Sequence, residues 1–114
     1  MSSEPNPSVP SRLISQLLLE DADLKDIVVE FVGGLDARLA ELRQAFDRLD
    51  WEHLVTLAHR LKGAAGSYGY PDISRVCAEL EREFRAHEAS GFTGALAELA
   101  RLVDAARAGL PAEV

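Results

Sequence analysis

The feature that most constrains the fold is a run of large apolar residues in the first half of the chain. Consecutive members are 4, 3, 4, 4, 3, 4 and 3 positions apart, which is the spacing of one face of an α-helix. The members are Leu24, Val28, Phe31, Leu35, Leu39, Leu42, Phe46 and Leu49. The phase is kept across Gly33 and Gly34, so the spacing predicts one long helix with a weak point or bend, but no break, at the two glycines.

Three further segments carry the helical period, and no segment alternates in the manner of a β-strand. The first follows Asp50, a suitable N-cap, and reaches about Tyr68. The second begins at Pro71, and the third follows Thr93, a suitable cap, and stops before Pro111. We therefore predict an all-α fold, an antiparallel four-helix bundle.

A short additional helix is expected ahead of the bundle, with Ser11 as its cap and an end near Glu20. The chain of 114 residues is long enough for one hydrophobic core and too short for two. The predicted organisation is a flexible N-terminal tail over residues 1–10, a helical domain over 11–110 and a C-terminal tail over 111–114.

Composition excludes several classes of function. The net charge is −7, from 19 acidic and 12 basic side chains, which disfavours binding to nucleic acid. No apolar run is long enough to cross a membrane, and no secretory leader is evident, so we expect a cytoplasmic protein. The single cysteine cannot form an internal disulfide. The acidic surface favours a monomer.

One histidine stands out on the helix predicted after Asp50. A helical wheel places His59 opposite the apolar residues of that helix, so its side chain faces away from the core. The residues expected on its face are Glu52, Val55, Thr56, Lys62, Gly63 and Gly66. Glycine weakens a helix, and two of them on one exposed face leave bare backbone beside the imidazole, where a partner can approach closely.

This arrangement suits phosphoryl chemistry. Neutral imidazole is a good nucleophile near pH 7, and it can attack phosphorus through one ring nitrogen. Lys62, three positions after His59, can offset charge on phosphoryl oxygens. The sequence contains neither a glycine-rich phosphate loop nor a dinucleotide-binding motif. The phosphoryl group must therefore come from another molecule.

The segment from His59 to Gly69 (HRLKGAAGSYG) resembles the signature of histidine-containing phosphotransfer (HPt) domains. Trp51, the Leu57-Ala58 pair and the Leu80-Glu81 pair also fit that family. The resemblance implies a four-helix bundle whose histidine accepts a phosphoryl group from an aspartyl phosphate on a receiver domain and passes it to a second receiver. An upstream hybrid histidine kinase would supply the relay. The domain would need no cofactor of its own, with Mg²⁺ expected on the receiver.

Carried over residue by residue, the resemblance makes His59 the phosphorylated residue and Lys62 the cation beside the phosphate. Gly63 would give the receiver room to approach, and Gly69 would end the helix. Gly66 departs from the family, where a larger residue is common. Val29, on the polar side of the predicted long helix, is expected to join Val55, Thr56 and the two glycines in a docking patch for the partner.

The remaining chemistry-bearing residues have structural interpretations. His53 is too far round the helix from His59 to share a metal, and no metal site is expected. We expect His87 near the C-terminus of a helix, where a cation suits the dipole, and Cys77 buried as a small apolar residue. Glu79, Glu81 and Glu83 are expected to form a solvated helix face.

Two alternative functions remain. A non-catalytic adaptor that binds receivers or other signalling proteins would not require His59. A small-molecule enzyme would need a second catalytic group, and none is evident. An autophosphorylating kinase histidine is disfavoured, because such a histidine is typically followed by an acidic residue and a Thr-Pro or Asn-Pro pair. Here Arg60 follows His59, and the nearest proline is Pro71.

Overall fold

The structure is a computed structural model that describes residues 10–111. Every regular element in this range is helical, as predicted. The elements are α1 (Gln16–Glu20), the 3₁₀ helix η1 (Ala22–Leu24), α2 (Lys25–Gly33), α3 (Leu35–Asp47), α4 (Trp51–Ser67), α5 (Pro71–Arg85) and α6 (Phe92–Ala108). The predicted tails lie outside the described residues, apart from Pro10 and Pro111.

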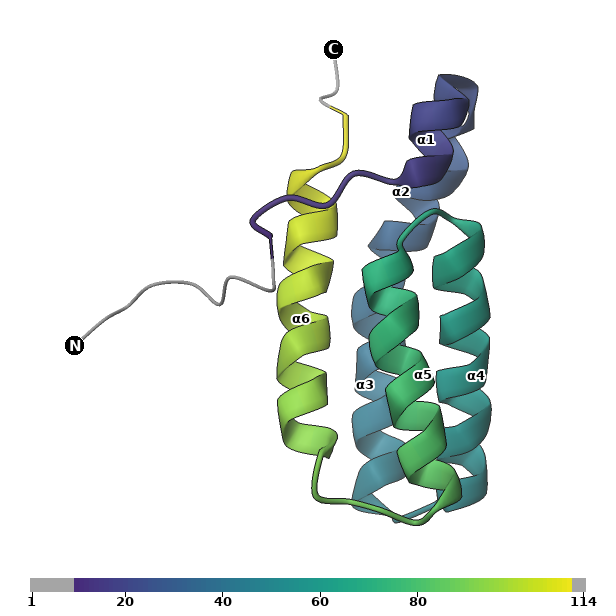
Figure 1. Ribbon diagram of the computed structural model, residues 1–114, viewed down its shortest axis with the longest axis vertical. Helices are drawn as coiled ribbons and strands as arrows, with labels where there is room; N and C mark the ends of the chain where they lie inside the picture. The colour runs from purple at the N-terminus through teal and green to yellow at the C-terminus, as the bar shows by residue number, and fades with distance from the viewer. Residues whose placement is uncertain (1–9, 112–114) are drawn as a thin grey trace, which may run out of the picture.

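Helices α3, α4, α5 and α6 form the bundle and run alternately up and down its long axis (Figure 1). The turns from α3 to α4 and from α5 to α6 lie at one end, and the turn from α4 to α5 lies at the other. Helices α4 and α5 pack against each other most extensively. Helix α1 lies at the end where α4 turns into α5 (Figure 1).

The single helix predicted from Leu24 to Leu49 is in fact two helices, α2 and α3, separated by Gly34. The interruption is narrow: the Gly34 N–H still donates to the Glu30 and Phe31 carbonyls, and ψ is −2°. The two glycines have low helix propensity, which makes this the weak point of the long apolar stripe. Leu49 lies beyond the end of α3 with φ at +52° and is 54% exposed, so it does not belong to the buried stripe.

The leading helix α1 is shorter than predicted, and its N-cap is Ser15 instead of Ser11. The Ser15 hydroxyl accepts a hydrogen bond from the Leu18 N–H at 3.2 Å and donates one to the Tyr68 carbonyl at 2.6 Å. Ser15 is 1% exposed, so this pairing satisfies a buried hydroxyl. A contact with the end of α4 therefore sets where α1 begins, and local sequence alone does not show such a contact.

Residues 12–16, which we call the N-terminal strap, join two parts of the bundle. The Leu13 N–H donates to the Ala105 carbonyl of α6 at 2.9 Å. The Gln16 N–H donates to the Gly69 carbonyl, just after α4, at 2.8 Å. Figure 1 shows this segment passing across the upper part of α6 to reach α1. The strap thus ties the last turns of α6 to the α4–α5 connection.

Helix α4, which carries the candidate residues, has the predicted boundaries. Its N-cap is Asp50, whose Oδ1 accepts the His53 N–H at 3.2 Å. After Ser67 the chain turns at Gly69, where φ is +90°. A Cβ at Gly69 would lie 2.6 Å from the Gln16 nitrogen, so both the backbone conformation and the close approach of the strap require glycine there.

Helix α5 begins at Pro71 as predicted, whereas α6 begins two residues earlier than expected. The N-cap of α6 is Gly91, which makes no side-chain hydrogen bond, and Thr93 lies inside the first turn of α6. The predicted Thr93 cap is therefore wrong. Phe92 is 5% exposed and stacks on Phe46 of α3 at 3.9 Å between ring centroids, so burial of an aromatic ring fixes the start of α6.

One continuous core lies between the helices. Its largest fully buried side chains come from α2 to α6 and from Tyr70 in the α4–α5 connection. They include Val28, Val32, Leu35, Leu42, Leu54, Leu61, Tyr70, Ile73, Leu80, Phe84, Leu99 and Leu102. Burial on this scale, about 25 cal/mol per Å² of apolar surface, makes the bundle a rigid support for the outer face of α4.

Candidate functional site

His59 lies near the middle of α4 with its side chain 63% exposed, as the helical wheel predicted. The opposite side of the helix is the buried one, formed by Leu54, Ala58, Leu61 and Ala65. Because these four side chains anchor α4 in the core, the helix cannot rotate His59 inward without exposing them. The imidazole is thus held at the surface by the packing of its own helix.

The imidazole is also oriented by a carboxylate that the sequence analysis had placed in solvent. His59 Nδ1 lies 3.1 Å from Glu81 Oε2, and the Glu81 side chain is only 9% exposed. The expectation that Glu79, Glu81 and Glu83 form a solvated face is therefore wrong at Glu81. One turn after Cys77 and next to Leu80, Glu81 belongs to the edge of α5 that faces α4.

Two further cations share the Glu81 carboxylate. Lys62 Nζ lies 2.8 Å from Oε1, and Arg85 Nη2 lies 2.7 Å from Oε2. Lys62, then Arg85 and His59, lower the pKa of Glu81 from 4.5 to about 2, although burial of the carboxyl acts in the opposite direction. Glu81 is therefore fully ionised at neutral pH.

This ionised carboxylate determines which ring nitrogen of His59 is available. A carboxylate without a proton can only accept a hydrogen bond. Nδ1 therefore carries the ring proton, and this N–H donates a hydrogen bond to Glu81. In a neutral imidazole the other nitrogen, Nε2, then holds the free lone pair. Because the side chain is largely exposed, the arrangement presents a nucleophilic nitrogen in one fixed orientation.

The two glycines beside His59 have no packing reason to be glycine. A Cβ built at Gly63 would meet nothing within 4 Å, and one at Gly66 would make only an ordinary contact, 3.6 Å from Ser74 Oγ. Both residues are exposed. The fold would thus accept side chains at either position, and their absence leaves bare helix backbone next to the ring.

The residues of the predicted docking patch lie on two helices, α4 and α2. Val55 and Thr56 lie on α4 but are half-buried; Val55 packs against the core, and the Thr56 hydroxyl donates to the Glu52 carbonyl. Val29 is 38% exposed on α2, which packs against η1, α3 and α6. Val55, Thr56, Gly63 and Gly66 thus share α4 with His59, and Val29 lies on α2, so the docking patch stays a prediction.

The other histidines and the cysteine have structural surroundings. The His87 ring stacks on Trp51 at 5.1 Å between centroids, and its backbone has φ at +56°, just past the end of α5. Cys77 is fully buried, and burial raises the pKa of its thiol to about 12. Among residues 10–111 no three metal-binding side chains cluster as a metal site. None of the helices in that range is long and apolar enough to span a membrane.

Comparison with known proteins adds a family and one relative. The model of the Hpt domain family matches residues 26–109, well over half of the chain. The sensor histidine kinase AruS of Pseudomonas aeruginosa is 35% identical over 66 residues, a segment that covers 58% of this chain and 7% of the kinase. No solved structure gives a significant match.

Proposed function

The chain belongs to the Hpt domain family, whose members carry out histidine phosphotransfer in two-component signalling, and we propose that His59 is the residue that carries the phosphoryl group. One observation supports this most directly: the imidazole is 63% exposed while its Nδ1 lies 3.1 Å from an ionised, buried carboxylate. Such a ring is free to react at Nε2 and is already aligned to do so.

In the proposed reaction, Nε2 attacks the phosphorus of an aspartyl phosphate on a receiver domain. A nitrogen–phosphorus bond forms, the bond from phosphorus to the aspartyl oxygen breaks, and the leaving electron pair stays on the aspartate carboxylate. Both ring nitrogens of His59 are then substituted, so the ring carries positive charge. Glu81 stabilises that charge at Nδ1, and attack by a second receiver's aspartate on the same phosphorus reverses the step.

Lys62 is proposed to supply positive charge to the phosphoryl oxygens. Its side chain is 35% exposed and lies on the face of α4 that carries His59, held by Glu81 at 2.8 Å. Arg85 pairs with the same carboxylate, so Glu81 keeps one cation when Lys62 turns toward a phosphoryl group. Mg²⁺ and the acceptor aspartate would come from the receiver.

The partners follow from this chemistry. We propose that the domain accepts its phosphoryl group from a receiver belonging to an upstream hybrid histidine kinase and delivers it to a separate response regulator. AruS is named as a sensor histidine kinase, and the segment it shares with this chain is a small part of it. A non-catalytic adaptor is the competing function, and the Glu81–His59 pair disfavours it, because binding alone does not need an oriented nucleophile.

Labelling by a phosphorylated receiver tests the proposal. A receiver domain carrying ³²P on its aspartate should label the wild-type chain with phosphate that is stable to base and labile to acid. His59→Gln should take no label, whereas His53→Gln and His87→Gln, which change the other two histidines, should be labelled like wild type. Label retained by His59→Gln would place the site elsewhere, and no label on wild type from any receiver would favour the adaptor.

Three further variants test the roles of the two residues around the ring, Glu81 and Lys62. Glu81→Ala should slow transfer roughly tenfold or more, because Nδ1 loses its acceptor and the ring its orientation. Glu81→Gln should fall between Ala and wild type, because an amide oxygen still accepts the Nδ1 proton without supplying charge. Lys62→Ala should lower the single-turnover rate with little change in the free energy of unfolding. Rates equal to wild type would remove these residues from the mechanism.

A further inference from the structure

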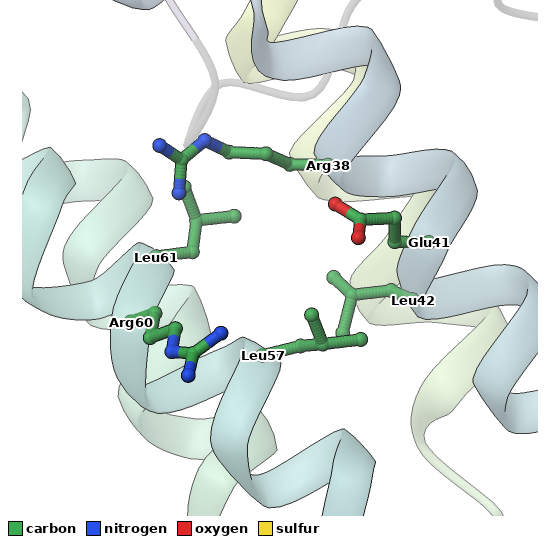
Figure 2. Close-up of a pocket in the computed structure, with 6 residues that line it drawn as sticks. All are labelled: Arg38, Glu41, Leu42, Leu57, Arg60 and Leu61. Atoms are coloured by element: carbon green, nitrogen blue, oxygen red, sulfur yellow. The ribbon is translucent and has the colours of Figure 1, made fainter.

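A groove between α3 and α4, on the side of His59 away from α5, has no role in the phosphotransfer described above. Its volume is about 370 Å³. It is lined by Arg38, Glu41, Leu42, Leu57, Arg60 and Leu61. Figure 2 shows the two guanidinium groups reaching the opening from different helices, Arg38 from α3 and Arg60 from α4, with the leucines forming its apolar wall. We call this feature the two-arginine groove.

The groove carries two positive charges and one negative charge, because Glu41 lines it together with the two arginines. Neither Arg38 nor Arg60 has a carboxylate within 4.0 Å among residues 10–111, which is also true of exposed arginines such as Arg101. What distinguishes Arg38 and Arg60 is that they line one groove. The chain has 19 acidic and 12 basic side chains, so potential partners are in excess. The groove is therefore a local positive site on a negatively charged molecule.

Arg38 is held in place by a contact other than an ion pair. Its guanidinium carbon lies 5.7 Å from the centroid of the Phe31 ring, and Phe31 in turn stacks on Tyr68 at 4.6 Å. This cation–π contact fixes a half-buried guanidinium without neutralising its charge. A partly desolvated, oriented cation binds a carboxylate more strongly than a freely solvated one.

Under the proposed function, a receiver docked at His59 would reach the edge of the groove that Arg60 forms. Arg60 directly follows His59 and is about 100° further round α4, toward α3, whereas Lys62 and Glu81 lie on the side toward α5. A receiver that brings its aspartate to Nε2 would cover the neighbouring surface on both sides of the ring. The opening of the two-arginine groove, where Arg60 lies, would then fall at the edge of the interface.

From this geometry, and resting on the proposed function, we infer that the two-arginine groove receives one acidic side chain from the docking receiver domain. A carboxylate between Arg38 and Arg60 would form charge-assisted hydrogen bonds with both, while its methylene groups contact the leucines. Glu41 faces the same opening (Figure 2). With Glu41 and one incoming carboxylate the charges of the two arginines are balanced, so a further negative charge would be repelled. The groove thus suits a single carboxylate and disfavours a polyanion such as nucleic acid.

Steady-state transfer from a receiver phosphorylated on its aspartate, with a second receiver present to take the phosphoryl group from His59, tests the inference. Arg38→Gln and Arg60→Gln should each raise KM for the receiver about threefold to tenfold and leave kcat within twofold, because they affect docking and not the reacting atoms. Arg101→Gln is the matched control, since Arg101 is an exposed arginine on α6. The KM difference should shrink in 0.5 M NaCl, where charges are screened.

A charge exchange identifies the receiver residue. Acidic residues on the receiver surface are changed to lysine one at a time, and one of these changes should be rescued by Arg60→Glu and by no change at Arg101. The inference is overturned if both glutamine variants match Arg101→Gln, if kcat falls at unchanged KM, or if no lysine change is rescued. Failure of the proposed function is distinct, because the wild-type chain would then take no label.

Discussion

At the scale of single residues, Glu81 organises the site. Its carboxylate lies within 3.1 Å of His59, 2.8 Å of Lys62 and 2.7 Å of Arg85. The exposed reactive ring thus depends on a buried acid from the neighbouring helix, whose ionisation the two cations secure. The same group of contacts therefore orients His59 and keeps Glu81 ionised.

The lowered pKa of Glu81 predicts how stability changes in acid. A carboxyl whose pKa falls from 4.5 to about 2 on folding stabilises the native state above pH 4.5, and this contribution is lost as the pH falls toward 2. Urea unfolding of wild type and of Glu81→Gln should therefore show a wild-type advantage at pH 6 that shrinks below pH 4.5. Glu79→Gln, which alters a more exposed carboxylate, is the control, and parallel curves for wild type and Glu81→Gln would contradict the prediction.

A side chain at Gly63 should separate stability from function. Gly63→Leu has open space and should raise the free energy of unfolding by up to about 1 kcal/mol through helix propensity. Phosphotransfer should slow at least tenfold, because the leucine occupies the space beside His59. Gly94→Leu on α6, where a Cβ also meets nothing within 4 Å, should leave transfer unchanged. Unimpaired transfer by Gly63→Leu would reject the role of the bare backbone.

The sequence was sufficient to predict the exposure of His59 and insufficient to find its partner. Periodicity within α4 decides which way His59 faces, because its own helix buries the opposite side. The contact with Glu81 depends on how α5 is placed against α4, which a single sequence does not specify. A signal was present, since Glu81 lies one turn after Cys77 on the buried stripe of α5. Val29 was expected to be exposed, and it is 38% exposed; its place in the docking patch stays a prediction.

At the scale of elements, helices were predicted better than their ends. Asp50 and Pro71 act locally and mark the starts of α4 and α5 correctly. By contrast, the start of α1 at Ser15 depends on the Tyr68 carbonyl, and the start of α6 depends on the stacking of Phe92 on Phe46. Rules for helix caps use the local sequence only, so they miss helix ends that are fixed by tertiary contacts.

The turn after α4 gives a prediction at this scale. Gly69→Ala should lower the free energy of unfolding by about 2 kcal/mol or more, because φ of +90° is strained for alanine and its Cβ would lie 2.6 Å from the Gln16 nitrogen. Hydrogen exchange should show faster opening in α1 and in the last turn of α4. Gly66→Ala, with ordinary space, is the control and should be neutral or stabilising.

At the scale of the whole molecule, the antiparallel bundle was predictable and the strap was not. Four long amphipathic segments with short connections leave few other arrangements. The N-terminal strap contributes backbone hydrogen bonds at two distant points, Ala105 and Gly69, and no local pattern marks such contacts. It closes the bundle at the end where α4 turns into α5.

Removal of the strap together with α1 should weaken the bundle without abolishing the site. A chain that starts at residue 21 loses the hydrogen bonds to the Ala105, Gly69 and Tyr68 carbonyls and should be less stable by about 2 to 4 kcal/mol in urea unfolding. Labelling of His59 at a temperature where the shorter chain is folded should persist, because Glu81 and Lys62 belong to α5 and α4. Loss of labelling in a folded shorter chain would show that the strap is part of the site.

The pairing of Nδ1 with Glu81 leaves Nε2 as the one ring nitrogen of His59 that can react, and this limits the order in which partner proteins can bind. If His59 carries the phosphoryl group as proposed, the donor and acceptor proteins would have to use the same nitrogen, so they would bind one after the other and never together. Such a carrier follows double-displacement kinetics, with parallel lines in double-reciprocal plots. An excess of either unphosphorylated partner would inhibit the other, because both partners would bind at the exposed Nε2 side of His59.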